Sequence, residues 1–295
     1  MIAGGLVIAE SKQSSPRRSA TLDEELWIPD LDRHVRDVRI DGPRGFLINL
    51  ADIHRGAVGH NEALLRRVVR AIKAVPPMRW TLGGDSVNLA TLTSPSSPFE
   101  ETEHGEDQID KVAEILGPIV GQCVAGIEGN HPARTKKFAN LSATKYLCRL
   151  LGVPYLESMA FVRFAVGHNT YVHVIHHSPF GTGGKRAGAT VNRVEDLADN
   201  YDGADAVWGE HSHGRAYARK YRIGFRGTQK DPALVQQLLI ASGSYQTWEG
   251  YARARPYRPG PTGSIIVEMT GSHHEKDMRV HERLRDFIAT LGLNV

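Results

Sequence analysis

The chain has 295 residues, with 36 lysines and arginines against 33 aspartates and glutamates, and 41% of its residues are hydrophobic. This length is enough for one large or two small domains with a buried core, and a charged fraction of 23% excludes disorder of the whole chain. A formal net charge of +3 argues against a polybasic coat for nucleic acid, although not against a local basic patch.

Membrane and export signals are weak in this sequence. No apolar run approaches the roughly 18 residues that a membrane-spanning helix needs. The short apolar run at 3–9 lacks the basic region that precedes the core of a signal peptide. Two cysteines, Cys123 and Cys148, cannot form a disulfide framework, which makes a reducing compartment the default. We therefore expect no membrane partner and a cytoplasmic location.

In the first half of the chain, strands and helices are expected to alternate. Residues 1–42 are heterogeneous, with a linker-like stretch rich in Ser, Pro and Arg, and are predicted to form an N-terminal extension. Strands are predicted at 46–50, 80–82 and 124–127, and helices at 62–75, 109–119 and 142–151. The loop at 93–109 is rich in Ser, Pro and acids. Its acidic part, 100–110, is expected to be a solvated surface segment, with a lid over the site as the alternative.

The second half of the chain is richer in strands. They are predicted at 161–166, 170–175, 204–208, 238–241 and 264–269, with one helix at 191–202. Alternation followed by a strand-rich half predicts an α/β fold, a two-sheet β-sandwich flanked by helices. The main domain is expected at 43–271. Residues 272–295 are expected to be a C-terminal extension, in which 278–291 forms either a helix or a strand followed by a helix.

Polar clusters follow five of the predicted strands. The clusters are Asp52–Gly56, Gly83–Asn88, Gly129–His131, His176–His177 and Gly209–His213. Ligands of open α/β sheets bind beyond the carboxyl ends of the strands, so we expect these clusters to converge. The alternate spacing within Asp52/His54 and His211/His213 would place each pair on one side of an extended segment.

The residue types in these clusters are those of a site for divalent cations. Carboxylate and imidazole suit Zn, Fe, Mn and Ni, and no thiolate is available for a structural zinc site. Asp85 is the natural bridging ligand because a tight Gly-Gly turn precedes it. Two cations about 3.5–4 Å apart would activate a water to attack phosphorus and stabilise both oxygens of an in-line displacement. This is the design of a phosphoester hydrolase.

The order of the motifs resembles the calcineurin-like metallophosphoesterase superfamily, over residues 45–271. That order is Asp-x-His-x-Gly, Gly-Asp-x-x-Asn, Gly-Asn-His, His, and His-x-His. Each piece alone is weak, since Asp52 or Asn130 in isolation would be interpreted as a turn or cap residue. Five pieces in this order at strand ends form a strong joint signal.

The resemblance implies a role for each matching residue. Asp52, His54 and His213 would hold one metal, Asp85 would bridge, and Asn130, His176 and His211 would complete the second site. His131 matches the catalytic histidine, which is not a ligand but stabilises or protonates the leaving oxygen. Asn88 matches a residue that supports the bridging aspartate and the substrate. The implied cofactors are two divalent ions, with Mn as first choice and Fe, Zn, Ni or Mg as alternatives.

Two features of the match leave alternatives open. His176 comes first after its strand and is favoured as the ligand, with His177 as the alternative. Glu210 stands between Gly209 and His211, where the family usually runs from Gly directly into His. This departure keeps the His-x-His spacing but would reshape the loop.

Basic residues suggest the substrate class. Arg134, Lys136 and Lys137 follow one motif and the basic residues of 215–222 follow another, either as solvated faces or as a phosphate-binding rim. An aromatic–basic stretch at 245–258 could stack bases or simply pack a loop, and packing is favoured. We therefore predict phosphodiesterase or nuclease-like activity on a phosphoester, possibly a nucleic acid or nucleotide. The alternatives are a phosphomonoesterase and a non-catalytic interaction scaffold, although no ligand is missing as a scaffold would predict.

Overall fold

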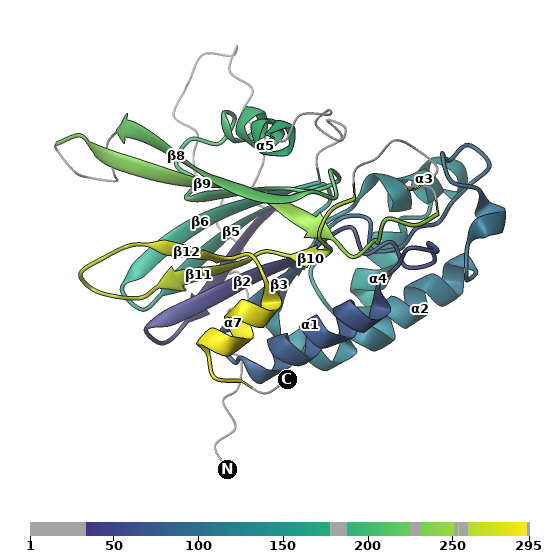
Figure 1. Cartoon of the computed structure of the whole chain (residues 1–295), viewed down its shortest axis with the longest axis horizontal. Coiled ribbons are helices and arrows are strands. Elements are labelled where there is room, and N and C mark those ends of the chain that lie inside the picture. The colour runs from purple at the N-terminus through teal and green to yellow at the C-terminus, as the bar shows by residue number, and fades with distance from the viewer. Residues whose placement is uncertain (1–33, 178–187, 225–230, 251–252, 254–258, 294–295) are drawn as a thin grey trace, which may run out of the picture. The chain divides into compact units, whose positions relative to one another are not determined.

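Two β-sheets lie face to face with helices on their outer sides (Figure 1). The structure is a computed structural model, and it describes residues 34–177, 188–224, 231–250, 253 and 259–293. The five-stranded sheet has the order β12-β11-β2-β3-β4. Its strands are β2 (Arg44–Leu50), β3 (Met78–Leu82), β4 (Cys123–Gly126), β11 (Ile266–Thr270) and β12 (Met278–His281).

The seven-stranded sheet has the order β1-β5-β6-β7-β9-β10, and β8 also pairs with β9. Its strands are β1 (Val35–Ile40), β5 (Met159–Val166), β6 (Asn169–His176), β7 (Ala206–Gly209), β8 (Arg215–Gly224), β9 (Ala233–Ser244) and β10 (Gly263–Ser264). The strand predicted at 264–269 is therefore two strands, because the chain passes from one sheet to the other between them. The two sheets and their helices confirm the predicted fold class.

The helices cover the outer faces of the sheets. They are α1 (Glu62–Ala74), α2 (Gly105–Leu116), α3 (Asn130–Ala139), α4 (Ala143–Leu151), α5 (Ala189–Ala198) and α7 (Leu284–Thr290), with short 3₁₀ turns at Pro98–Glu100 and Gly117–Gln122. Helices α1, α2 and α4 pack on the five-stranded sheet and α5 packs on the other (Figure 1). Among the described helices, none combines the length and apolar character needed to cross a bilayer.

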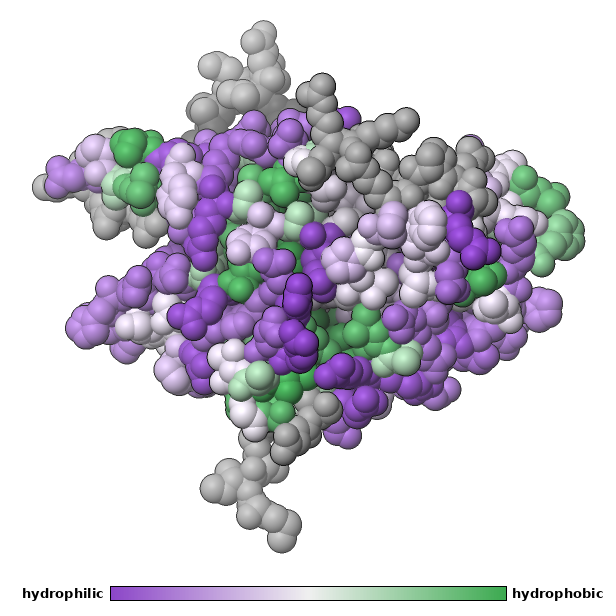
Figure 2. Space-filling view, viewed as in Figure 1, coloured by the Kyte–Doolittle hydropathy of each residue, from purple (hydrophilic) through white to green (hydrophobic). Residues whose placement is uncertain are grey.

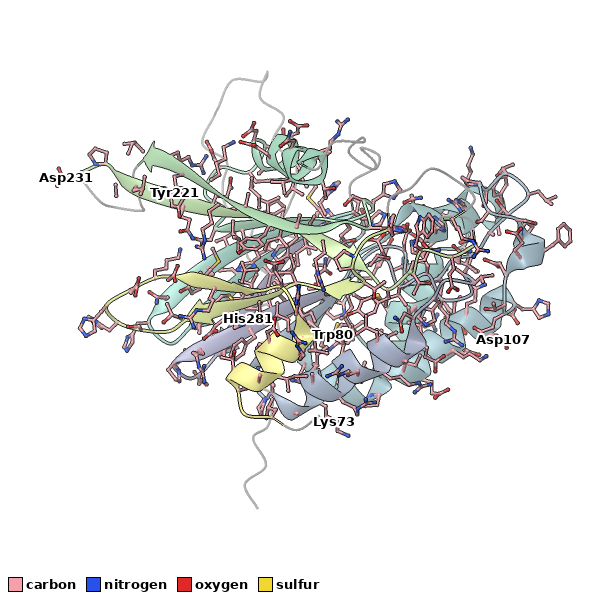
Figure 3. All side chains as sticks on the ribbon, in the orientation of Figure 1. Lys73, Trp80, Asp107, Tyr221, Asp231 and His281 are labelled. Atoms are coloured by element: carbon pink, nitrogen blue, oxygen red, sulfur yellow. The ribbon has the colours of Figure 1, made fainter. Side chains whose placement is uncertain are left out.

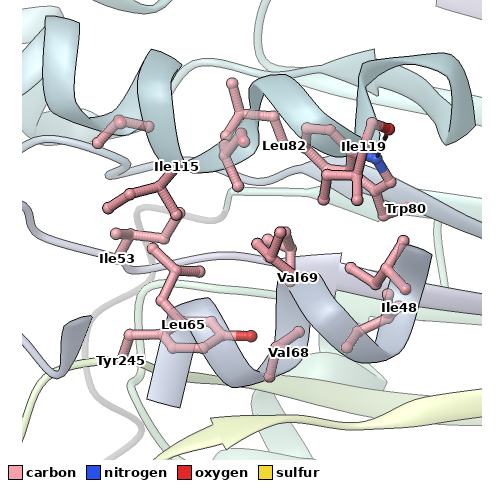
Figure 4. Packing of buried hydrophobic residues seen from close by; sticks show 14 of the residues in the cluster. Ile48, Ile53, Leu65, Val68, Val69, Trp80, Leu82, Ile115, Ile119 and Tyr245 are labelled. Carbon is pink, nitrogen blue, oxygen red and sulfur yellow. Dashed lines mark hydrogen bonds between the residues drawn. The ribbon is translucent and has the colours of Figure 1, made fainter. Parts of the chain in front are cut away.

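Both faces of the central strands are buried, which explains their nearly continuous apolar sequences. In β2, Leu47 points between the sheets, whereas Ile48 and its alternate neighbours point toward the helices. Figure 4 shows Ile48 close to Val68 of α1, with Trp80 of β3 on the same side of the sheet. The Trp80 indole donates to the Ile119 carbonyl over 2.7 Å, so this large side chain is buried without an unsatisfied N–H.

The predicted domain boundaries fall inside the folded unit, which runs from residue 34 to the end of the chain. Strand β1, from the predicted N-terminal extension, pairs in parallel with β5. Strand β12, from the predicted C-terminal extension, pairs with β11, and Phe287 of α7 is fully buried. The two ends therefore complete the sheets and the core rather than extend from them. Residues 1–33 of the predicted extension lie outside the described residues.

Strand direction decides where the site forms. β2, β3 and β4 are parallel neighbours in one sheet, and β6 and β7 are parallel neighbours in the other. All five predicted polar clusters follow these strands. Their carboxyl ends therefore deliver the clusters to common edges of the two sheets.

Candidate metal centre

The loops that follow β2 and β3 stay hydrogen-bonded to each other beyond the ends of the strands. The Asp52 amide donates to the Gly84 carbonyl over 2.9 Å, and the His54 amide donates to the Asp85 carbonyl over 2.9 Å. The two loops thus continue side by side beyond the parallel strands β2 and β3. Asp52 and Asp85 therefore lie at the same edge of the sheet.

Five of the predicted ligands have a left-handed backbone conformation. Their φ angles are 50° at Asp52, 49° at His54, 56° at Asp85, 70° at His211 and 54° at His213. Aspartate and histidine tolerate this region better than most residues, but each such position still costs roughly 1–3 kcal/mol. The predicted pairs do converge, yet the predicted cause is wrong. Left-handed turns, rather than alternation along an extended segment, aim these side chains.

Asp52 and Asp85 are completely buried. In each carboxylate, one oxygen accepts a hydrogen bond from a backbone amide and the other does not. Asp52 Oδ2 accepts from the His211 amide over 3.0 Å, and Asp85 Oδ1 accepts from the His131 amide over 2.7 Å. The other oxygens, Asp52 Oδ1 and Asp85 Oδ2, are buried and meet no hydrogen-bond donor within the described part of the chain. A buried carboxylate oxygen without a donor is costly, so both atoms fit the role of cation ligands.

The first candidate cation site lies between Asp52, His54 and His213. Nε2 of His213 is 3.4 Å from Asp52 Oδ1, and Nε2 of His54 is 3.7 Å from the same oxygen. The two Nε2 atoms are 2.9 Å apart. All three ligand atoms therefore face one point, and one carboxylate with two imidazoles is a donor set that suits a divalent cation.

The second candidate site is formed by Asp85, Asn130, His177 and His211. Nε2 of His177 is 3.4 Å from Asp85 Oδ2 and 3.0 Å from Asn130 Oδ1. The ligand atoms of Asp85, His177 and His211 lie within 4.8 Å of one another. Asp85 also forms a group with His54, a ligand of the first site, and with His131. Asp85 thus neighbours ligands of both sites, as is expected of a bridging carboxylate.

His177, and not the predicted His176, supplies the imidazole that follows β6. Side chains alternate along this strand, so His173 and Ile175 point between the sheets and Val174 points toward α5. By the same alternation His176 lies on the outer face. His177 continues the inner face and reaches the cluster, where it is 5% exposed.

Glu210 is the residue inserted where the family has Gly followed directly by His. It is buried and accepts hydrogen bonds from three groups. Its Oε2 accepts from Nδ1 of His177 over 2.9 Å and from the Gly84 amide over 2.6 Å. Its Oε1 accepts from Nδ2 of Asn49 over 2.7 Å. A carboxylate that binds one ring nitrogen of a ligating histidine fixes the tautomer and aims the other nitrogen at the cation. The sequence marked Glu210 only as a departure, and its position beside His211 was the one available sign of this role.

The Gly83-Gly84 pair is needed because these partners approach so closely. A Cβ atom at Gly83 would lie 2.8 Å from Oε1 of Glu210, and one at Gly84 would lie 2.2 Å from Nδ1 of His177. A side chain at either position would push the partner out of the site. The turn before Asp85 is therefore tight for the sake of His177 and Glu210.

Acids and imidazoles of the cluster shift one another's protonation. Burial alone would raise the pKa of the Asp52 carboxyl, but His213 holds this pKa well below its usual value. Burial alone would lower the pKa of His177, but Asp85 raises it well above its usual value. Imidazolium thus compensates the buried acids when no cation is bound. Cation binding would replace these protons and release them.

His131 lies in the first turn of α3 with its ring beside the cluster. Its Nδ1 donates to the Asn88 carbonyl over 2.9 Å, which leaves a lone pair on Nε2. Nε2 is 3.9 Å from Asp85 Oδ2. Burial lowers the pKa of His131 to about 3, although the nearby Asp85 carboxylate opposes this shift, so the ring is neutral.

The two predicted substrate contacts have protein partners in the structure. Nδ2 of Asn88 donates to Glu101 over 2.9 Å, so Asn88 reaches the site through its backbone carbonyl, which holds His131. Among the described residues its side chain has no hydrogen bond to Asp85, and the support of Asp85 by Asn88 stays a prediction. Arg134 lies one helical turn after His131 and donates to Oγ of Ser94 over 2.9 Å.

The acidic segment predicted to be solvated is partly built into the support of the site. Glu101 accepts from the Ala90 amide over 2.7 Å, and Glu103 accepts from Nε of Arg55 over 2.7 Å. Both contacts join the segment to loops that carry metal-ligand candidates. The segment therefore supports these loops through Glu101 and Glu103, while its other acids, Glu100, Glu106, Asp107 and Asp110, are exposed, as expected for a solvated surface segment.

Lys220 and Arg222 of β8 are paired with acids rather than directed at the site. Lys220 binds Asp199 over 2.6 Å, and Arg222 forms an ion pair with Asp202. Tyr221, which lies between them in the strand, stands at the opposite end of the view from α3 (Figures 1 and 3). The predicted phosphate-binding rim is therefore wrong for this part of β8.

Tyr245, the first aromatic residue of the predicted aromatic–basic stretch, is a core residue. It is fully buried, and Oγ of Ser264 donates to its hydroxyl over 3.1 Å. This residue packs a loop, as favoured above. Residues 251–252 and 254–258 of the stretch lie outside the described residues.

No protein-family model matches the sequence, and no curated protein matches it. Among solved structures, a metallophosphoesterase from Sphaerobacter thermophilus is 13% identical, with a TM-score of 0.35, and the match covers 84% of this chain and 95% of that one. The NAD nucleotidase of Haemophilus influenzae is 10% identical, with a TM-score of 0.42 and coverage of 81% of this chain and 49% of that one. The present chain thus spans about half the length of the nucleotidase.

A third similar structure is Vps29 in complex with Zn²⁺ from Entamoeba histolytica, at 11% identity, with a TM-score of 0.36 and coverage of 80% of this chain and 98% of that one.

The histidine doublet gives a first test of the site. We expect His177→Ala to lower the metal content by about one ion per chain, because Nε2 of His177 faces Asp85 and Asn130. His176→Ala serves as the matched control and should keep the wild-type content. Metal analysis after equilibration with Mn²⁺ and removal of free metal makes the comparison. Loss of metal from the His176 variant alone would reverse the assignment.

Glu210 gives a second test. Glu210→Gln should weaken the binding of one cation by about 10–100-fold, because an amide cannot accept from all three donors and His177 loses its orientation. Glu268→Gln is the matched control, since Glu268 binds His281 over 2.8 Å in the other sheet. Mn²⁺ titration by calorimetry gives the affinities, and circular dichroism checks the fold. Equal affinities for both variants would show that Glu210 does not position the ligand.

Proposed function

We propose that the chain hydrolyses phosphoesters at a centre for two divalent cations, as its resemblance to calcineurin-like metallophosphoesterases implies. The observation that supports this most is the pair of buried oxygens, Asp52 Oδ1 and Asp85 Oδ2, which face imidazole nitrogens without a hydrogen-bond donor among the described residues. Asp52, His54 and His213 would hold one cation, Asn130, His177 and His211 the other, and Asp85 both.

The donor set suits divalent metals that are hard or of intermediate hardness as Lewis acids. Carboxylate, carboxamide and imidazole without thiolate fit Mn, Fe, Zn or Ni, with Mg as a harder alternative, and Mn²⁺ is the first choice for restoring activity. Bound cations would polarise the phosphoester and activate water. The buried carboxylates of Asp52, Asp85 and Glu210 supply the negative charge that balances two such cations.

His131 is the residue we propose for proton transfer to the leaving oxygen. The hydrogen bond from Nδ1 to the Asn88 carbonyl fixes the ring, and Nε2 is left as the atom that exchanges a proton. An anionic phosphoester beside the ring would raise its pKa from the low value that burial imposes. The histidine would then carry the proton that the departing oxygen needs.

We propose phosphodiesters, possibly of nucleotides or nucleic acid, as the substrate class. A diester carries one negative charge at the reacting phosphate, whereas a monoester carries up to two. Lys220 and Arg222 of β8 are paired with acids, and so is Arg55, which adjoins His54 and pairs with Glu62 and Glu103. This modest supply of positive charge favours the singly charged group.

Removal of the His131 imidazole should slow turnover without loss of metal. His131→Gln should keep two bound cations and lower kcat by about 10²–10⁴-fold, with the greatest loss for poor leaving groups. His281→Gln is the control, because His281 binds Glu268 away from the cluster. Rates for a series of aryl diesters are measured with both variants. Equal losses for good and poor leaving groups would contradict proton transfer by His131.

The substrate class is tested with bis(p-nitrophenyl) phosphate and p-nitrophenyl phosphate in the presence of Mn²⁺. We expect the diester to be the better substrate, and a chelator or Asp85→Asn to abolish turnover of both, because Asp85 is shared by the two cation sites. A clear preference for the monoester would assign a phosphomonoesterase. Two bound cations without turnover of either ester would assign the non-catalytic scaffold.

A further inference from the structure

A pocket of about 210 Å³ lies between α1, the β10 segment and the start of α7. Four arginines line it, and they come from segments far apart in the sequence: Arg67, Arg215, Arg283 and Arg285. No acidic residue is among the described residues that form its wall. Figure 2 shows strongly hydrophilic residues over the start of α7, next to an apolar strip over α1.

The positive charge of this arginine pocket is poorly compensated. Arg285 pairs with Asp286 over 3.1 Å, and Arg215 donates to the Thr262 carbonyl over 3.2 Å. Within the described chain, no carboxylate forms an ion pair with the side chain of Arg67 or Arg283, and neither side chain has a hydrogen bond there. Like charges that converge without counter-charges repel one another, and an anion between them would remove this repulsion.

Arg215 differs from the other three arginines of the pocket because it is partly shielded from solvent, whereas they are exposed. Its guanidinium is always charged. A guanidinium that has lost part of its hydration attracts an anion more strongly than a fully hydrated one.

One wall of the arginine pocket is apolar. It is formed by Ile48 of β2, Leu64 and Val68 of α1, and Leu284 at the start of α7. Figure 4 shows Ile48 and Val68 close together in the packing between β2 and α1. On the same volume measure a single water needs about 10–15 Å³, so the space admits a phosphate group with a small attached body.

We propose that the arginine pocket binds the phosphate group of a small phosphorylated molecule whose body lies against Ile48, Leu64 and Val68. Guanidinium groups match phosphate oxygens with paired N–H donors, and the absence of acids from the described wall selects for an anion. This site is separate from the candidate metal centre, because none of its lining residues is a proposed cation ligand. It therefore stands whether or not the proposed hydrolysis is correct.

The test is calorimetric titration of the full-length protein with inorganic phosphate, AMP and adenosine. The double variant Arg67→Gln/Arg283→Gln removes the two arginines without ion pairs, both of which are exposed. The matched control is Arg70→Gln/Arg279→Gln, which removes two exposed arginines from α1 and β12 outside the pocket. Arg215 is kept, since it follows His213 by two residues. Asp85→Asn separates phosphate binding in the pocket from phosphate binding at the metal centre.

We expect the wild type, the control and Asp85→Asn to bind AMP, and the pocket variant to bind it at least tenfold more weakly. Phosphate should bind more weakly than AMP, and adenosine should not bind measurably. Unchanged AMP affinity in the pocket variant would overturn the proposal. So would AMP binding that disappears in Asp85→Asn, because the anion would then occupy the metal centre. Equal binding of adenosine and AMP would overturn the role of the phosphate group.

Discussion

The structure around the site depends on the burial of two carboxylates. Asp52 and Asp85 have no exposed surface, and each gives one oxygen to a backbone amide and keeps the other for the cluster. An ionised group in such a place must be compensated, or the free energy of unfolding falls by several kcal/mol. The tight loops and the left-handed backbone angles bring amides and histidines close to the two buried carboxylates, where they compensate the negative charge. The strained backbone and the chemistry of the site thus both follow from the burial of these carboxylates.

The hydrogen bonds of these carboxylates also join elements that are far apart in the sequence. Oδ1 of Asp85 binds the amide of His131 in the first turn of α3, so the carboxylate acts on the helix N-terminus as well as on the cluster. Glu210 extends the network from β7 to Asn49 of β2. Because these hydrogen bonds join both sheets, a displacement of one loop would strain both. The coupling keeps the ligand atoms within the narrow range of distances that a bound cation requires.

The sequence predicted the parts of the site that depend on local pattern. Asp52, His54, Asp85 and His131 follow strands whose apolar runs are unmistakable, so their convergence followed from strand direction. The choice of His176 over His177 was wrong because the sequence places the end of a strand only to within about one residue. A shift of one residue moves a side chain to the opposite face of the sheet. Glu210 could not be placed, since its partners Asn49 and Gly84 are 161 and 126 residues away.

The same distinction explains the errors in the fold. Strand β1 has the sequence VRDVRI, in which charged residues separate the few apolar ones, so its pairing with β5 leaves little trace in composition. Strand β12 and the seven-residue helix α7 confirm the alternative of a strand followed by a helix, although both are too short for periodicity to have decided it. Their places in the sheet and core are set by the neighbours they pack against, and these neighbours are known only once the chain has folded.

Both sheets contribute ligands to the cluster. Strands of the five-stranded sheet are followed by Asp52, His54, Asp85 and Asn130, whereas strands of the other are followed by His177, His211 and His213. Cation binding and the association of the sheets are therefore linked equilibria. A ligand that binds only the assembled pair, at 100 times its dissociation constant, stabilises it by about 2.7 kcal/mol. In a cell, the supply of the metal would then govern how long the folded protein persists as well as what it can do.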